Sequence, residues 1–196
     1  MREFLFKYRG KIPLPLMAAV FIWLFSRPHP PERNYTIIFI GLGISLIGES
    51  IRIWAVGYAG ASTRGKKAKA KQLITGGPYA YVRNPIYIGN FLVALGAVLT
   101  IQSWVVASIF IFYFALIYHL IVEHEEAYLG KEFGEAYRSY TEKVPRFFPS
   151  LKAYDNSQGE FKWRELRKEY WSILGLTMAF LLINLSPVIS SWIRNG

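Results

Sequence analysis

Acidic and basic side chains occur in this sequence inside stretches that are otherwise apolar. Glu49 and Arg52 lie three residues apart in the apolar stretch 35–60, a spacing that places both on one face of a helix. Ionisable groups at that depth in a membrane are costly unless they pair or line a polar cavity, so they are candidates for function. We therefore predict Glu49 and Arg52 as catalytic residues. The alternative is a structural pair that neutralises itself.

A second group of titratable side chains follows the fourth apolar stretch, where Glu123, His124, Glu125 and Glu126 are consecutive. Carboxylates at this position can hydrogen-bond ribose hydroxyls or face a cationic ligand. Aromatic residues then follow at spacings of four and three, which align on one helical face: Phe133, Tyr137 and Tyr140. The alternative is a solvated helix end whose aromatic face packs on the membrane surface.

The segment 76–89, GGPYAYVRNPIYIG, combines a turn with a helix start. Two glycines and a proline require a turn, and Asn84 followed by Pro85 is typical of an N-cap and a first helical position. Unpaired N–H groups at a helix start beside Arg83 can bind a carboxylate or a phosphate. The alternative is a capped re-entry into a membrane with interfacial tyrosines.

The composition limits the kind of protein that positions these groups. The chain has 196 residues, of which 53% are hydrophobic and 18% charged, and a formal net charge of +10. This hydrophobicity excludes intrinsic disorder. The absence of cysteine excludes disulfides, thiolate metal sites and a thiol nucleophile, and with three histidines we predict no metal site. Nucleic-acid binding is not expected either, because the basic residues are dispersed over loops between apolar stretches.

Five apolar stretches predict an all-α integral membrane protein with about five transmembrane helices in one membrane domain. These stretches cover residues 12–25, 35–60, 85–100, 104–122 and 171–193. The turn at 100–103 is so short that the third and fourth spans should be antiparallel neighbours. Residues 61–84 form a basic loop, and residues 123–170 form a polar helix and loop between the fourth and fifth spans. Gly134 is a predicted helix break, and residues 144–150 are predicted as extended chain.

The basic residues predict the orientation of these spans. Alternating the five spans places nineteen of the 23 Lys and Arg residues on one side, with Arg27, Arg33 and Arg194 on the other. By the positive-inside rule the N-terminus is then cytoplasmic and the C-terminus outside. The loops 61–84 and 123–170 lie on the cytoplasmic side in this prediction.

Three motifs in this order resemble a known superfamily: GPYAYVRNPIYIG, EEAYLGKEFGEAYRSY and VPRFFP. Between Ile44 and Pro149 the chain resembles the isoprenylcysteine carboxyl methyltransferase and phospholipid N-methyltransferase superfamily of integral membrane enzymes. The family's R-H-P-x-Y-x-G stretch falls on Arg83, Asn84, Pro85, Tyr87 and Gly89, and its paired glutamates fall on Glu125 and Glu126. Asn84 replaces the family's frequent histidine, and asparagine does not titrate near neutrality. The resemblance does not reach the fifth span.

The resemblance implies S-adenosylmethionine as cofactor, bound at the cytoplasmic ends of the third and fourth spans. Residues 123–170, between the fourth and fifth spans, are then expected to complete a cytoplasmic cofactor-binding region. In the expected site, Arg83 and the helix start hold the methionine carboxylate, and Glu125 or Glu126 binds the ribose or the ammonium group. The predicted cofactor-binding residues are Tyr81, Val82, Arg83, Asn84, Pro85, Tyr87, Gly89, Glu125, Glu126, Tyr137 and Tyr140. Tyrosine faces suit a sulfonium through cation–π attraction.

The methyl acceptor is expected to be a lipid or a prenylated small molecule that enters from the bilayer, with its head near Arg146 or near Glu49 and Arg52. These three are the predicted catalytic residues. An acceptor carboxylate, as in isoprenylcysteine, needs a cationic anchor, whereas an amine, as in phosphatidylethanolamine, needs a base. Two further readings stay open: an NADPH-dependent enzyme of sterol-reductase type, and a non-enzymatic protein that gathers anionic lipids through residues 64–71.

Overall fold

The computed structural model describes residues 8, 13–26, 33–60, 72–167 and 169–195. Within these ranges every regular element is a helix and none is a strand, as the sequence predicts. The elements are α2 (Pro13–Ser26), α3 (Tyr35–Ala59), the 3₁₀ helix η2 (Gly77–Ala80), α4 (Pro85–Leu99), α5 (Trp104–Lys143), α6 (Trp163–Leu166) and α7 (Tyr170–Asn195). The predicted lipid-gathering segment 64–71 and the basic residues before residue 8 lie outside the described residues.

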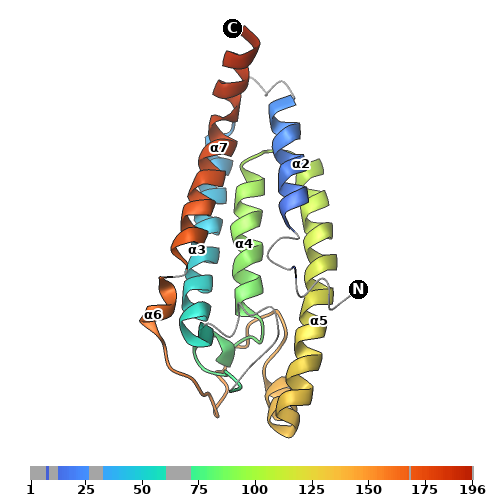
Figure 1. Cartoon of the computed structure of the whole chain (residues 1–196), viewed down its shortest axis with the longest axis vertical. Helices are drawn as coiled ribbons and strands as arrows, with labels where there is room; N and C mark the ends of the chain where they lie inside the picture. The colour runs from blue at the N-terminus through green and yellow to red at the C-terminus, as the bar shows by residue number, and fades with distance from the viewer. Residues whose placement is uncertain (1–7, 9–12, 27–32, 61–71, 168, 196) are drawn as a thin grey trace.

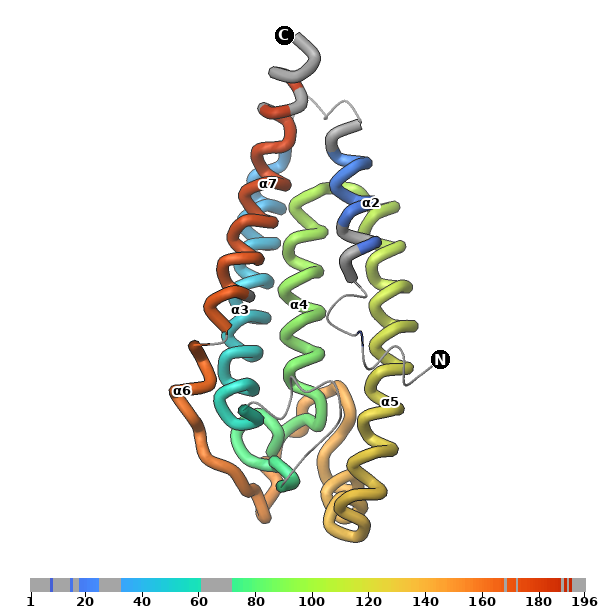
Figure 2. Tube along the Cα trace, viewed as in Figure 1, coloured from blue at the N-terminus to red at the C-terminus, as the bar shows by residue number. Residues whose placement is uncertain are grey.

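The long helices run side by side as an elongated bundle (Figure 1). α4 contacts α3, α5 and α7, and α2 packs against α7. The end of α3, the start of α4, the end of α5 and the segment after α5 gather at one end of the bundle, far from the C-terminus (Figure 2). The polar residues predicted to form the site therefore converge at that end.

Capping side chains and turn residues explain where α3 and α5 start. Asn34 accepts a hydrogen bond from the Ile37 amide at 3.3 Å, and Ser103 accepts one from the Val106 amide at 3.4 Å, so each closes a helix start whose N–H groups lack partners. α4 ends at Leu99 and α5 begins at Trp104. The tight turn predicted between the third and fourth spans is confirmed.

Glycines let α3 and α4 approach closely. A Cβ atom on Gly48 would lie 2.6 Å from the Val93 nitrogen and 2.8 Å from the Gly89 carbonyl oxygen, both shorter than van der Waals contact. Ser45 hydrogen-bonds the Val93 carbonyl across the same interface at 3.0 Å. Small residues with a hydroxyl bridge are typical of helices that pack in membranes, where apolar burial alone does not drive association.

The outer surface of the bundle is apolar. Trp104 and Phe112 on α5 are 85% and 73% exposed, and α3 exposes Phe39 and Ile47 in the same way. α3 and α5 are each long and apolar enough to cross a membrane, whereas α4 and residues 173–187 of α7 are apolar but shorter. Large apolar side chains facing outward suit lipid rather than water, so the chain is a helical protein with two candidate membrane-spanning helices.

Arg33 lies just before α3 and connects it to α4 and α7 at the end of the bundle opposite the predicted site. Its guanidinium donates to the Thr100 carbonyl at 2.7 Å and to the Asn184 carbonyl at 3.2 Å. Thr100 caps the C-terminal end of α4, where the last carbonyls lack helical partners, and Asn184 lies inside α7, three residues before Pro187. The side chain predicted to face outside therefore has a structural role.

Gly134 bends α5, as predicted. Its backbone angles are φ 52° and ψ −121°, a left-handed conformation that favours glycine. The last turns of α5 then fold back toward the loops, where Tyr137, Tyr140 and Val144 are buried together. This small core anchors the end of α5 to the segment before α4.

Candidate functional site

Two loops are joined by backbone hydrogen bonds at the site end of the bundle. The Arg83 amide donates to the Pro145 carbonyl at 2.9 Å, and the Ser150 amide donates to the Tyr81 carbonyl at 2.8 Å. The segment after α5 thus lies against the segment before α4, but it bends at residues 146–148 rather than running extended throughout, which corrects the prediction for residues 144–150. Six residues, 145–150, lie beside the three residues 81–83, so the chain between the two hydrogen bonds has to bend. Side chains from residues 83–84 and from residue 146 are thereby brought close to α5.

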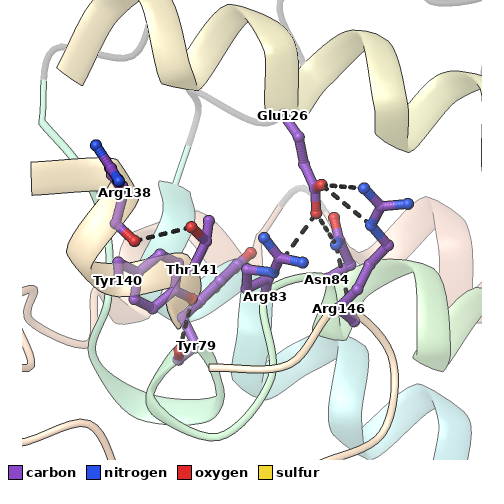
Figure 3. A network of polar contacts seen from close by, with 8 residues as sticks. All are labelled: Tyr79, Arg83, Asn84, Glu126, Arg138, Tyr140, Thr141 and Arg146. Carbon is purple, nitrogen blue, oxygen red and sulfur yellow. Dashed lines mark hydrogen bonds and ion pairs between the residues drawn. The ribbon is translucent and has the colours of Figure 1, made fainter. Parts of the chain in front are cut away.

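Glu126 is the centre of the resulting polar network (Figure 3). Arg146 donates to its Oε2 atom from Nε at 3.0 Å and from Nη2 at 2.6 Å. Asn84 donates to its Oε1 atom at 3.2 Å, and the Arg83 Nε atom lies 3.6 Å from that oxygen. Three distant parts of the sequence therefore converge on one largely buried carboxylate. Arg146, predicted beside the acceptor, lies next to the predicted cofactor-binding residues, and its contact with an acceptor stays a prediction.

Asn84 does not cap α4, and this corrects the sequence-based prediction. It occupies the N-cap position, but its side chain accepts no hydrogen bond from the helix. Its amide instead donates to Glu126 and to the Arg146 carbonyl, the latter at 3.3 Å. An ionised carboxylate is a stronger acceptor than a neutral group, so Glu126 orients the amide away from the helix.

Glu125 takes a different partner from Glu126. Its Oε2 atom accepts a hydrogen bond from the Tyr87 hydroxyl at 2.7 Å. The Tyr87 ring packs edge-on against Tyr118, with 5.2 Å between centroids, and Tyr118 stacks on Phe114 at 3.8 Å. The paired glutamates thus fasten α5 to the first turn of α4 at two separate points.

Tyr137 and Tyr140 lie in the small core below the network. The Tyr140 hydroxyl donates to the Tyr79 carbonyl at 2.7 Å, and the side chain is almost fully buried. Burial raises the pKa of Tyr137, Tyr140 and Tyr79 above the usual value for a phenol, with nearby anionic carboxylates as a smaller cause. All three therefore stay neutral over the physiological range. Their predicted contact with a cofactor stays a prediction.

Val82, Pro85 and Gly89 contribute backbone and packing. Val82 is buried, and Pro85 is the first residue of α4. A Cβ atom on Gly89 would lie 2.7 Å from the Gly48 carbonyl oxygen, so the close contact between α3 and α4 accounts for the glycine. Their predicted contact with a cofactor is likewise untested.

Glu49 and Arg52 form a second ionic group. It also includes Glu169, a carboxylate that the sequence analysis did not predict. Arg52 Nη1 lies 3.6 Å from Glu49 Oε2, and Arg52 Nη2 donates to Glu169 Oε2 at 2.5 Å. The Glu169 side chain is only 1% exposed. Its position just before the last apolar stretch was the available signal, but nothing in the sequence indicated that it would meet Arg52.

The segment before α7 brings Glu169 to α3. The Lys162 amide donates to the Gly57 carbonyl at 2.7 Å, and a Cβ atom on Gly57 would collide with the Phe161 ring. The chain then turns through α6, and the Glu169 amide bonds the Leu166 carbonyl at 2.8 Å. The absence of a side chain at Gly57 therefore permits the contact that positions Glu169.

The two ionic groups lie on different sides of the start of α4. Arg52 packs against Gly89, one turn into α4, and interacts electrostatically with Tyr118. Tyr118 in turn contacts Tyr87, the partner of Glu125. Tyr87 and Tyr118 therefore connect the Glu125–Glu126 side with the Glu49–Arg52 side. In the described part of the chain no three His, Asp or Glu side chains form a metal-binding group.

Comparison with known proteins places these residues in a family. The model of the phospholipid methyltransferase family matches residues 35–136, which is more than half of the chain. The chain belongs to this family. The match includes α3, α4, Glu125 and Glu126, and it ends before Arg146 and Glu169. No solved structure matches the chain.

Individual relatives differ in what their names say they do. The chain is similar to the cobalt-zinc-cadmium resistance protein CzcN of Cupriavidus metallidurans, with 30% identity over 65% of this chain and 53% of the relative. It is 28% identical to the nickel-cobalt-cadmium resistance protein NccN of Alcaligenes xylosoxydans xylosoxydans, over 77% of this chain and 68% of the relative. It is 36% identical to the protein-S-isoprenylcysteine O-methyltransferase of Schizosaccharomyces pombe, over 56% of this chain and 48% of the relative. The chain thus spans about half the length of two of these relatives.

Proposed function

We propose that this protein is an S-adenosylmethionine-dependent methyltransferase that acts on an amphiphile in the membrane. The convergence of Arg83, Asn84 and Arg146 on Glu126 carries this proposal. It places cationic and anionic groups together at the start of a helix, and Arg83, Asn84 and Glu126 lie within the residues that match the phospholipid methyltransferase family.

The residues at this end fit the polar groups of the proposed cofactor. The Arg83 Nε atom is buried and donates no hydrogen bond to a described residue, so Arg83 can bind the methionine carboxylate. Glu125 and Glu126 can accept hydrogen bonds from ribose hydroxyls or from the ammonium group. When bound, S-adenosylmethionine supplies an activated methyl group on a cationic sulfonium. The chain's own residues position the two reactants and exclude water, which lowers the barrier through proximity and orientation.

The acceptor would meet this site from the side of Glu49 and Arg52. The resemblance to isoprenylcysteine methyltransferases favours a carboxylate acceptor, for which Arg52 or Arg146 would be the anchor. A phosphatidylethanolamine-type amine is the alternative, for which a Glu49 oxygen would accept the proton that the nitrogen loses. In both cases we propose that Glu49, Arg52 and Arg146 contact the acceptor.

The proposed topology has five membrane spans, a cytoplasmic N-terminus and a C-terminus outside, in the cytoplasmic membrane. The outward apolar side chains of α3 and α5 support membrane insertion. The gathering of the polar loops at one end of the bundle (Figure 1) supports a single face for the site. The excess of basic residues in those loops supports the cytoplasm as that face.

Binding of the cofactor tests the proposed function directly. S-adenosylmethionine should raise the unfolding temperature of the detergent-purified protein, because a ligand that binds only the folded state stabilises it. Arg83→Ala and Glu126→Gln should remove this shift. Arg138→Ala, at an exposed residue of α5, should retain it. A shift caused by NADPH instead, or an unchanged shift in both site variants, would show that the proposed site is wrong.

A further inference from the structure

An exposed group of apolar side chains follows α5 at the site end of the bundle. Phe148 is 85% exposed, Leu151 is fully exposed, and Pro149 between them is exposed as well. Large apolar side chains that gather at a surface mark a contact with a partner or a membrane. We call residues 148–151 the apolar tip.

Backbone hydrogen bonds hold the apolar tip near the start of α4. The Ser150 amide donates to the Tyr81 carbonyl at 2.8 Å, and the Tyr154 amide donates to the Ala80 carbonyl at 2.9 Å. Both carbonyls lie just before Pro85, where the apolar helix α4 begins. Figure 2 shows the segment after α5 returning from the bent end of α5 to the level of the α4 start. The tip therefore lies where the apolar part of the bundle ends.

Exposed aromatic residues near α6 and α7 mark the same level. They are at least 61% exposed and comprise Trp163 in α6 and Tyr170 and Trp171 at the start of α7. Figure 1 shows α6 at the level of the α4 start. Exposed tryptophan and tyrosine at the ends of apolar helices are typical of the boundary between acyl chains and headgroups. The apolar tip lies at the level of this aromatic belt.

Basic residues flank the apolar tip. Residues 143–152 contain Lys143, Arg146 and Lys152 and no acidic residue. Lys143 and Lys152 are exposed, whereas Arg146 binds Glu126. Lysines attract anionic headgroups, and neighbouring apolar side chains enter the boundary below those headgroups. Charge and hydrophobicity at the tip thus favour the same partner.

We propose that the apolar tip inserts Phe148 and Leu151 into the headgroup boundary of an anionic bilayer, with Lys143 and Lys152 beside lipid phosphates. The partner is the leaflet that surrounds the start of α4. This contact goes beyond the proposed function and does not require methyl transfer. Because Arg146 lies two residues before Phe148 and bonds Glu126, the inserted tip tethers the Glu126 network to the membrane.

Single-cysteine variants test the insertion, because the chain has no cysteine of its own. Phe148→Cys and Leu151→Cys are labelled with the fluorophore NBD and placed, without cofactor, in nanodiscs of phosphatidylcholine and phosphatidylglycerol. Arg138→Cys is the control, since Arg138 is 73% exposed on the last turns of α5, beyond the start of α4 (Figure 1).

The quenchers distinguish the headgroup boundary from water. Labels at residues 148 and 151 should lose most of their fluorescence to a nitroxide carried on the lipid near the headgroup, and little to iodide in solution. The label at residue 138 should show the reverse. Both faces of a nanodisc are open to iodide, so low quenching by iodide reports burial of the label.

The lysines are tested with the label at residue 151. Quenching by nitroxide-labelled phosphatidylglycerol, relative to phosphatidylcholine with the same nitroxide, measures the enrichment of the anionic lipid at the tip. Lys143→Gln and Lys152→Gln should each lower this enrichment by up to about fivefold, as expected for one lysine at an anionic surface. Lys131→Gln, at another exposed lysine of α5, is the matched control and should leave it unchanged.

Three results would contradict the proposal. Iodide quenching at residues 148 and 151 as strong as at residue 138 would overturn the insertion. Labels shielded from both quenchers would overturn it as well, because another protein chain would then cover the tip. Unchanged lipid enrichment in both lysine variants would overturn the preference for anionic lipid. If one cysteine variant does not fold, the label at the other position decides. All of these measurements are made without S-adenosylmethionine, so they fail or succeed independently of the proposed function.

Discussion

Glu126 and Glu49 are both carboxylates withdrawn from solvent, yet their surroundings are opposite. Glu126 accepts hydrogen bonds from Asn84 and Arg146 and lies 3.6 Å from Arg83 Nε. Glu49 accepts none from the described residues. A carboxylate whose oxygens are bonded within the chain holds segments together, whereas one whose oxygens are not bonded is ready for a ligand. Glu126 thus organises the proposed cofactor site, whereas the oxygens of Glu49 are available for the proposed acceptor.

The location of each carboxylate explains the difference. Glu126 lies where two loops meet a helix end, and loops offer side chains and unpaired backbone groups in many directions. Glu49 lies inside α3, where the neighbouring backbone groups are all used by the helix. Its ion-pair partner in the described chain is Arg52, which also binds Glu169. A polar side chain inside a helical membrane bundle therefore has few possible partners, and a carboxylate there can lack hydrogen-bond donors.

The largest effect is expected from removing the centre of the Glu126 network. Glu126→Ala leaves Arg83, Asn84 and Arg146 without their shared acceptor, and we expect a loss of about 3 kcal/mol in the free energy of unfolding. Unfolding of the detergent-solubilised protein by denaturant measures it. Glu142→Ala, at an exposed ion pair, should change the value by less than about 1 kcal/mol. Equal losses of stability in the two variants would show that Glu126 stabilises the fold no more than an exposed carboxylate does.

Separating α3 from α4 should affect both sites at once. In Gly89→Ala the new methyl group meets the Gly48 carbonyl at 2.7 Å, and overpacking of this kind destabilises by about 1–3 kcal/mol. Binding of S-adenosylmethionine and methylation of a membrane amphiphile should both weaken. Gly43→Ala is the control, because a Cβ atom at Gly43 meets nothing within 4 Å. Unchanged binding of S-adenosylmethionine would mean that the Glu126 network does not depend on the contact between α3 and α4.

Loss of the Tyr140 hydroxyl tests how much the small core contributes to the free energy of unfolding. Tyr140→Phe removes the hydrogen bond to the Tyr79 carbonyl and should cost about 1 kcal/mol at neutral pH. Because burial raises the folded-state pKa of Tyr140, the unfolded chain ionises first, and the wild type loses stability as the pH rises above the usual phenol value of about 10. This alkaline loss should be smaller in the variant.

Unfolding curves between neutral pH and about pH 11 check the Tyr140 prediction. Tyr170→Phe is the control, because Tyr170 is 61% exposed and its substitution should leave the pH dependence unchanged. An identical alkaline loss in wild type and Tyr140→Phe would show that this phenol does not contribute.

The smallest effect on stability is expected at Glu49. Glu49→Gln replaces a buried charge that lacks donors by a neutral amide, which is easier to bury. The ligand-free protein should therefore be unchanged or more stable by up to about 1 kcal/mol, in contrast to Glu126→Ala. Denaturant unfolding without added lipid measures it. A loss as large as that of Glu126→Ala would make Glu49 an organising residue as well.

Local sequence signals predicted much of the framework. Ser103 marks the start of α5 and Gly134 its bend, because a hydroxyl can cap a helix and a left-handed conformation favours glycine. The prolines after α5 predicted an extended segment, but the segment bends at residues 146–148 where it hydrogen-bonds beside the helix start. The prediction for Asn84 was wrong in its detail, since the cap rule considers only the local helix and not a carboxylate 42 positions away.

The sequence alone determined the helical class, the main apolar helices, the turn between α4 and α5, and the family to which the chain belongs. These follow from periodicity, capping residues and motifs, all of which act over short distances along the chain. Only the tertiary structure decided which charges meet: Arg146 with Glu126, and Glu169 with Arg52. Such pairs join residues from separate elements, and their energies depend on burial and on competing partners that no local pattern contains.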